Sequence, residues 1–343
     1  MQSRTPKILL GALACGTAFT LFRVLAGTPE NNNSTTNASN TTTTTTTTKP
    51  AASAPILLAQ AATPPQIGAV GGGNSGAGAE IAAEHADWKL AWEDDFSKDN
   101  GKIDPKKWAF KIDGKGNGNG ESEYYTDDPK NAHIEDGALV MTVQKENKEW
   151  AHYTSSKLWT QGLYSFEYGR AEACIKAPTA QPGNWPAFWL MPDEPSPYGA
   201  WPGCGEIDIM EMVNDAKTLY GTVHYGSSWR DKAGSSIVAP DAGDFSKDFH
   251  VYGIEWEKDQ FRFYLDHKPF GKVDGKISDV KNQWWTPQYV YPAPFNQKFY
   301  LILNFAVGGD WPNNVVTPKR KLPDADGTFP QNMYVKWVRV YQP

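Results

Sequence analysis

Gly205-Glu206-Ile207-Asp208-Ile209-Met210-Glu211 is the most informative stretch of this chain, because it sets three carboxylates within six residues of an otherwise apolar run. Side chains of a β-strand alternate between two faces, so Glu206 and Asp208 point the same way. Strict alternation puts Met210 on that face, whereas a β-bulge near Ile209 or Met210 returns Glu211 to it. The segment therefore predicts a bulged strand that lines one surface with three acids.

Three acids on one surface are costly, because like charges repel and burial disfavours ionisation. A solvated strand edge, with acids that only promote solubility, is the alternative. Clustered acids with altered pKa values are typical of active sites, however, and paired carboxylates carry out glycoside hydrolysis. The strand therefore predicts a glycosidase centre.

Short strand-like segments, separated by Gly, Pro, Asn and Asp, recur along the rest of the chain. No long segment has the 3.6-residue period of a helix, and Asp266-His267-Lys268 is typical of a hairpin turn. The pattern predicts an all-β sandwich of two antiparallel sheets. The expected strands are Ala138–Val143, Leu163–Tyr168, Arg170–Ile175, Gly205–Val213, Leu219–His224, Phe249–Trp256, Gln260–Leu265, Phe299–Ala306 and Met333–Tyr341.

The 343 residues divide by composition into three parts. All 14 tryptophans lie between Trp88 and Trp337, so residues 84–343 can build a core and form the expected catalytic domain. Residues 27–83 contain an unbroken Thr41–Thr48 run and are rich in Asn, Pro, Ala and Gly. Such a segment cannot bury enough apolar surface to offset its chain entropy, so we expect a disordered linker.

Residues 1–26 have the pattern of a targeting segment. Arg4 and Lys7 precede a mostly apolar run, Ile8–Phe22, that is short for a membrane span. The segment is interpreted as a signal peptide or an uncleaved signal anchor, with lipidation at Cys15 as a third alternative. All three predict a protein that is secreted or anchored at the cell surface, and the last two include membrane anchoring.

The net charge indicates which class of partner the chain binds. The net charge of −6 disfavours nucleic acid and polyanions, and a neutral ligand fits better.

Cys174 and Cys204 either form one disulfide or remain buried free thiols. No Cys/His spacing suggests zinc, so neither a metal nor a cofactor is expected. Nothing in the sequence requires an oligomer, and we expect a monomer.

Tryptophans are concentrated immediately before the acidic strand, in Gly183–Trp189 and at Trp201. Concave sites with aromatic walls and a few polar groups are usual for small ligands, and indole rings stack on the C–H faces of sugars. This favours a binding cleft for Trp185 and Trp201 over a place in the core. For Trp189 the two interpretations are equally supported.

Several ordered motifs from residue 86 to 343 resemble glycoside hydrolase family 16, and within it the laminarinase-like endo-β-1,3-glucanases. The motifs are Trp92–Phe96, Glu121–Thr126, Tyr153–Ser156, Tyr168–Arg170, Trp185–Trp189, Trp201–Glu211, Gly221–His224, Ala306–Gly309 and Val338–Tyr341.

The resemblance implies a β-jelly roll with a concave sugar-binding cleft and a β-glucan as substrate. It implies that Glu206 is the nucleophile, that Glu211 is the general acid/base, and that Asp208 adjusts their protonation. The expected reaction is endo-acting hydrolysis of β-1,3 bonds in laminarin-type, or mixed β-1,3/1,4, glucans by retaining double displacement. The bulged spacing that contains Met210 is the laminarinase form.

The resemblance also implies further sugar-contacting residues. Asn119 and Glu121 lie in a Gly-rich loop that family members use at the cleft. Arg170 matches an arginine that reaches the sugar, with a structural ion pair as the alternative. His224 is expected to face the cleft, with a satisfied core histidine as the alternative.

The chain departs from the family pattern at one position, and three functions other than glucan hydrolysis are alternatives. Relatives bind a structural calcium ion through an Asp in the last strand, where this chain has Lys336, so no calcium is expected there. The other functions are a non-catalytic β-glucan recognition protein, a transglycosylase, and a member of the family that acts on agarose or carrageenan. The three acids oppose the first, and the negative charge opposes carrageenan.

Overall fold

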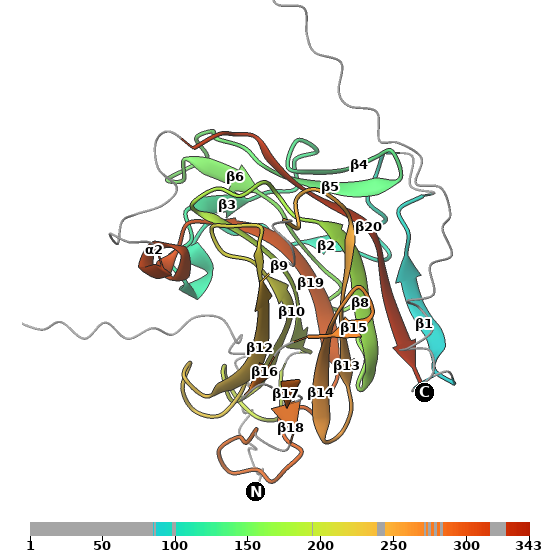
Figure 1. Ribbon diagram of the computed structural model, residues 1–343. Coiled ribbons are helices and arrows are strands. Elements are labelled where there is room, and N and C mark those ends of the chain that lie inside the picture. The colour runs from blue at the N-terminus through green and yellow to red at the C-terminus, as the bar shows by residue number, and fades with distance from the viewer. Residues whose placement is uncertain are drawn as a thin grey trace, which may run out of the picture. The chain divides into compact units, whose positions relative to one another are not determined.

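The computed structural model describes residues 85–343, apart from 86, 98–100, 194, 239–243, 271, 274–275, 278–279, 282–283 and 316–326. The targeting segment and the linker predicted for residues 1–83 therefore lie outside the described residues. The regular secondary structure of the described part is almost entirely strand, and most of the strands form two large sheets that lie against each other (Figure 1). The prediction of an all-β sandwich is confirmed.

One sheet contains nine of the described strands, in the order β15-β14-β13-β8-β20-β5-β4, with β1 paired to β20 and β18 paired to β14. The described strands of this sheet all pair antiparallel. Its strands are β1 (Lys89–Asp94), β4 (Ala132–Glu135), β5 (Ala138–Val143), β8 (Gly169–Lys176), β13 (His250–Trp256), β14 (Gln260–Leu265), β15 (Lys268–Pro269), β18 (Val280–Lys281) and β20 (Gln331–Gln342).

The other sheet contains seven of the described strands, in the order β12-β11-β10-β9-β19-β7-β2, and is also antiparallel. These are β2 (Ala109–Phe110), β7 (Lys157–Trp159), β9 (Asn184–Pro192), β10 (Glu206–Glu211), β11 (Thr218–His224), β12 (Lys232–Val238) and β19 (Phe299–Val307). The smaller elements are a parallel pair, β3 (Glu123–Tyr125) with β6 (Tyr153–Ser155), a short hairpin, β16 (Lys272–Val273) with β17 (Lys276–Ile277), a 3₁₀ turn, η1 (Gly116–Gly118), and one helix, α2 (Asp310–Val315).

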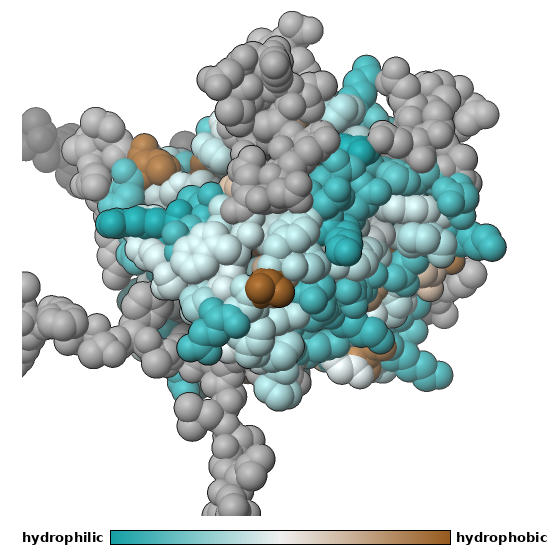
Figure 2. All heavy atoms as spheres, turned by 90° about the horizontal axis from the view of Figure 1, so that it is seen from below, coloured by the Kyte–Doolittle hydropathy of each residue, from teal (hydrophilic) through white to brown (hydrophobic). Residues whose placement is uncertain are grey.

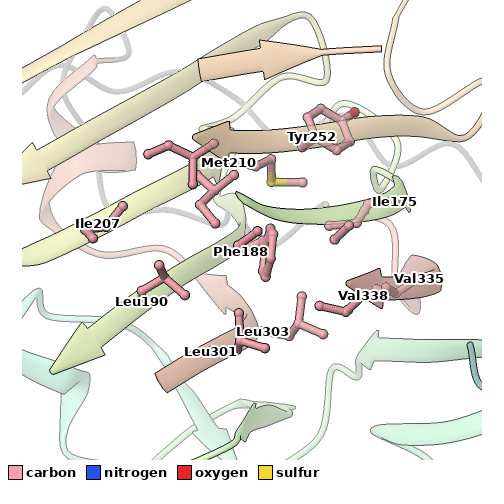
Figure 3. Close-up of a cluster of buried hydrophobic side chains, with 14 of the residues drawn as sticks. Ile175, Phe188, Leu190, Ile207, Met210, Tyr252, Leu301, Leu303, Val335 and Val338 are labelled. Atoms are coloured by element: carbon pink, nitrogen blue, oxygen red, sulfur yellow. The ribbon is translucent and has the colours of Figure 1, made fainter. Parts of the chain in front are cut away.

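The core lies between the two large sheets, where each contributes alternate side chains. Figure 3 shows Phe188, Leu190 and Ile207 of the seven-stranded sheet gathered with Ile175 and Val338 of the nine-stranded sheet. All five are fully buried and belong to one apolar cluster. Because strand residues alternate, their neighbours in sequence point outward, and this fixes which side chains reach each outer face.

Most predicted strands are present with bounds that agree to within two residues. The hairpin turn is also confirmed: Leu265 pairs with Lys268, and Asp266 and His267 have positive φ values of 51° and 61°, as a two-residue primed turn requires.

The strand predicted at Leu163–Tyr168 is wrong. The backbone turns at Thr160, whose carbonyl accepts hydrogen bonds from the N–H groups of Leu163 and Tyr164, and the segment keeps only one bridge, from Phe166 to Phe299. Strand β9 was not predicted, because Pro186 and Pro192 lie within it and proline lacks the N–H that a strand ladder uses.

Three further findings concern the two cysteines, the surface and the helices. Cys174 and Cys204 are both buried and are not joined to each other, so the structure selects two thiols over the disulfide. Figure 2 shows brown, apolar colouring on this face only as separate spots among teal and white residues. Among the helices of the described residues, not one has the length and apolarity needed to cross a membrane.

Candidate active site

The acidic strand β10 contains the predicted bulge. Asp208 lies opposite Trp189 of β9, but Met210 lies opposite Phe188, so Ile209 is the additional residue on that side. Ile209 and Met210 are both fully buried in the core, and Figure 3 shows Met210 in the buried cluster. The extra residue therefore returns Glu211 to the outer face. We call this outer face of the seven-stranded sheet the acid face.

Glu211 is held by Trp185 of β9. The indole Nε1 donates a 2.9 Å hydrogen bond to Oε1 of Glu211. Burial raises the pKa of Glu211 to about 7, the Trp185 hydrogen bond lowers it, and the negative charge of Glu206 raises it. Trp185 is buried and meets Trp311 edge to face at 5.6 Å between ring centroids, so the indole donor is fixed in place. A carboxyl with this pKa can donate and accept a proton near neutral pH.

Glu206 is held from the loop that precedes β10. Trp201 donates from Nε1 to Oε2 of Glu206 at 2.7 Å, and the Trp201 ring lies 5.8 Å from that of His224. His224 is opposite Glu206 in the β10–β11 register. Burial lowers the pKa of His224, which favours the neutral imidazole at this edge of the site.

Asp208 lies between the two glutamates and is only 3% exposed. Burial raises its pKa well above the usual range, and the charges of Glu206 and Glu211 raise it further. Its Oδ2 has no hydrogen-bond partner and lies 3.4 Å from Nε2 of His224. Asp208 is therefore favoured in its neutral form, which reduces the negative charge between the two glutamates.

The Gly-rich loop also reaches the acid face, through a bridge from Glu121 to Gly308, the residue after β19. Glu121 is buried and accepts hydrogen bonds from Asn119 Nδ2 at 3.2 Å and from the hydroxyl of Tyr125 at 3.1 Å. The Tyr125 hydroxyl in turn accepts a 3.0 Å hydrogen bond from Nδ2 of Asn304 on β19. This network links the loop to the sheet.

Trp189 belongs to the acid face and not to the core, because it is opposite Asp208, and its neighbours Phe188 and Leu190 are core residues. Its Nε1 donates a 2.7 Å hydrogen bond to Oδ1 of Asn304. The structure thus settles the even choice that the sequence left for this tryptophan.

Lys157 was not predicted. It is opposite Asn304 in the β7–β19 register, and its Nζ lies 4.7 Å from the ring centroid of Trp189. Burial lowers its pKa, while the charges of Glu121 and Glu206 raise it. Strand alternation next to Leu158, a core residue, was the signal that could have found it.

Arg170 is the candidate that the structure does not bring to the acid face. It lies on β8 in the nine-stranded sheet, next to the core residue Ala171, and so points to the opposite side of the sandwich. Its guanidinium lies 3.7 Å from Glu172 and 3.9 Å from Glu255, and 4.4 Å from the ring centroid of Tyr341. These are the contacts of the alternative interpretation, a structural ion pair.

One group within the described part of the chain has metal-ligand spacing. Ligand atoms of Glu206, Asp208 and His224 all lie within 4.8 Å of one another. The group coincides with the acids and the histidine of the acid face described above. The absence of a metal remains a prediction of the sequence.

Comparison with known proteins gives concordant results. A β-glucanase of Rhodothermus marinus is 36% identical over 281 residues, which cover 79% of this chain and 91% of that protein. The catalytic domain of an endo-1,3-β-glucanase (laminarinase) from Thermotoga petrophila RKU-1 is 37% identical, with a TM-score of 0.62 over 74% of this chain and 98% of that domain. The laminarinase from Rhodothermus marinus is 36% identical, with a TM-score of 0.64 over 74% of this chain and 97% of that one.

The family model for glycosyl hydrolases family 16 matches residues 119–317, which include Asn119 and Glu121, the tryptophans of the acid face and the acidic strand. The matched range thus contains every group assembled on the acid face. With the two-sheet fold, the bulged strand of acids and this match in agreement, the chain belongs to glycosyl hydrolase family 16.

Proposed function

We propose that this protein is a retaining endo-β-1,3-glucanase that hydrolyses laminarin-type glucans and, in addition, mixed β-1,3/1,4-glucans. One observation carries the proposal: Glu206 and Glu211 share one face of one strand, and the pKa of Glu211 is raised to about 7. The β-glucanases and laminarinases to which the chain is similar support this class of substrate.

In the first step, a carboxylate oxygen of Glu206 attacks the anomeric carbon of a glucosyl unit. Glu211 transfers its proton to the glycosidic oxygen, whose bond to that carbon breaks, and a covalent glycosyl-enzyme forms. The hydrogen bond from Trp201 occupies Oε2 of Glu206 and leaves Oε1 for attack. Retaining enzymes hold their two carboxyl groups roughly 5–5.5 Å apart, a separation that suits direct attack.

In the second step, Glu211 is ionised and takes a proton from water, and the resulting hydroxide displaces Glu206 from the anomeric carbon. Asp208 supports both steps because its neutral carboxyl can donate a hydrogen bond to Glu206 without adding charge. The indoles of Trp185, Trp189 and Trp201 supply apolar walls with N–H groups that already have partners. Of the three rings, that of Trp201 is exposed and open to stack on a sugar face, whereas Trp185 is buried.

Product analysis on laminarin tests the proposal, with barley mixed-linkage glucan, agarose and carrageenan in parallel. We expect a ladder of laminari-oligosaccharides from the wild-type protein and none from Glu206→Gln. Proton NMR of the earliest products should show the β-anomer, because two displacements retain configuration. Laminarin that is bound but not cleaved, or cleavage that survives Glu206→Gln, contradicts the proposal.

A further inference from the structure

A hollow of about 330 Å³ lies beside the catalytic acids, and of its lining residues only Trp201 belongs to the reaction described above. Two chain segments, 197–203 and 287–289, form its walls together with Gly226 and Ser227. None of these lining residues is charged, although the whole chain carries a net charge of −6. An uncharged, partly aromatic hollow of this kind favours a neutral ligand with both apolar and hydroxyl surfaces.

Two tyrosines of the hollow are locked in position. Tyr198 and Tyr289 meet edge to face, with 4.9 Å between ring centroids and 83° between ring planes. The Tyr198 hydroxyl donates to Oδ1 of Asn296 at 2.7 Å, and the Tyr289 hydroxyl donates to the carbonyl of Pro197 at 2.7 Å. Both hydroxyls are thus occupied inside the protein, yet 46% of the Tyr289 surface remains exposed. What Tyr289 offers a ligand is therefore its ring, held rigid before binding.

The hollow adjoins the active site at Trp201. The same indole that lines the hollow donates to Oε2 of Glu206 and lies against His224. A ligand in the hollow therefore lies beside the residue that orients the nucleophile.

We propose that this hollow is a further glucan subsite, which binds a backbone glucosyl unit beyond Trp201 and stacks its C–H face on the ring of Tyr289. Gln288 and Ser227, which also line the hollow, supply polar groups for its hydroxyls. The inference rests on the proposed function, since it assigns the hollow to the same polysaccharide. It implies that long substrates bind more tightly than short ones, because only long chains fill the hollow and the acid face together.

Kinetics on laminari-oligosaccharides of increasing length test this subsite. Tyr289→Ala removes the ring, and we expect KM for laminarihexaose and laminarin to rise about tenfold, as for the loss of one aromatic contact. For laminaritriose, KM and kcat should stay at the wild-type values. Tyr289→Phe keeps the ring and removes only the hydroxyl, and we expect it to match the wild type at every length. Tyr291→Ala is the matched control, because Tyr291 is 40% exposed, lies outside the hollow and donates to the carbonyl of Lys258.

Three results overturn the subsite. Equal KM values for Tyr289→Ala and the wild type on hexaose show that the ring is unused. An equal rise in KM on triose and hexaose, or a rise in Tyr289→Phe as large as in Tyr289→Ala, shows that the substitution has displaced segment 287–289 and that the ring itself does not bind the substrate. In each case the wild type still cleaves laminarin and the proposed function stands. A wild type that cleaves no glucan contradicts the proposed function itself, and isothermal titration of laminarihexaose into wild type and Tyr289→Ala then tests the hollow separately.

Discussion

Trp185 and Glu211 are joined by a 2.9 Å hydrogen bond from the indole Nε1 to Oε1, and this bond opposes the burial that raises the pKa of the acid to about 7. The tryptophan therefore has two functions at this site. It fixes the position of the carboxyl group, and it limits the pH range over which that group stays protonated.

The first prediction concerns pH. Glu211 must carry a proton to donate it to the glycosidic oxygen, so kcat/KM should fall as the pH rises through about 7. The hydrogen bond from Trp185 favours the ionised form, and its removal in Trp185→Phe should raise the pKa of Glu211. The alkaline limb of the profile of kcat/KM against pH should then move to higher pH. Trp337→Phe, in the nine-stranded sheet, is the control, and an alkaline limb that stays in place in Trp185→Phe contradicts the assignment.

The second prediction separates the roles of the two glutamates. Glu206→Gln removes the nucleophile and should lower kcat more than about 10⁴-fold on every substrate. Glu211→Gln removes the proton donor and should lower kcat/KM on laminarin roughly 10²- to 10⁴-fold. An aryl laminaribioside with an acidic phenol needs no protonation to depart, so Glu211→Gln should form the glycosyl-enzyme from it at nearly the wild-type rate. Burst kinetics of phenol release measure this step. Equal losses for both variants on the aryl substrate contradict the assignment of roles.

The third prediction concerns Lys157, a cation against the ring of Trp189 on the acid face. Among the described residues, no carboxylate forms an ion pair with Lys157, so its ammonium group is available to sugar hydroxyls. Lys157→Met keeps most of the length and removes the charge, and kcat/KM for laminarin should fall roughly 10- to 100-fold. Lys176→Met is the matched control. Lys176 lies 4.6 Å from the ring centroid of Tyr334, but in the nine-stranded sheet. Similar losses in both variants indicate a structural effect.

The fourth prediction concerns Arg170, which lies on the other side of the sandwich. Arg170→Met leaves the buried carboxylates of Glu172 and Glu255 with one positive neighbour fewer. The free energy of unfolding should fall by roughly 3 kcal/mol, as for a broken buried ion pair. The KM for laminarin should stay at the wild-type value. Urea unfolding and steady-state kinetics measure the two quantities. A raised KM with unchanged stability supports the sugar contact that the family resemblance implied.

The sequence predicted the features that depend on local periodicity. The three acids, the bulge and the hairpin at Asp266 follow from alternation and turn chemistry within a few residues. Strand β9 was not predicted because proline disfavours a strand, and Pro186 and Pro192 both lie within it. The strand forms nevertheless, because it pairs with β10 on one side and with β19 on the other.

Local periodicity does not show which of the two sheets a strand belongs to. It therefore could not predict on which side of the sandwich an outward-pointing residue lies. Alternation separates Arg170 from Ala171, but only the order of strands in the two sheets shows that Arg170 points away from the acids. The same holds for Lys157 and Trp189, whose neighbourhood depends on the pairing of β7 with β19 and of β19 with β9. Such contacts join residues far apart in the chain, and one sequence does not record them.

The placement of both glutamates on a single strand has a consequence for how this protein can change. The spacing of the reacting groups depends on six consecutive residues, Glu206–Glu211, and not on how two distant elements dock. The groups around them come from other places: Trp185 from β9, Lys157 from β7, and Trp201 and Tyr289 from loops. Substitutions in those loops and strands can therefore alter which polysaccharide is accepted while the distance between the two catalytic carboxyl groups stays constant. In this fold, substrate selectivity can thus change without a change in the reaction.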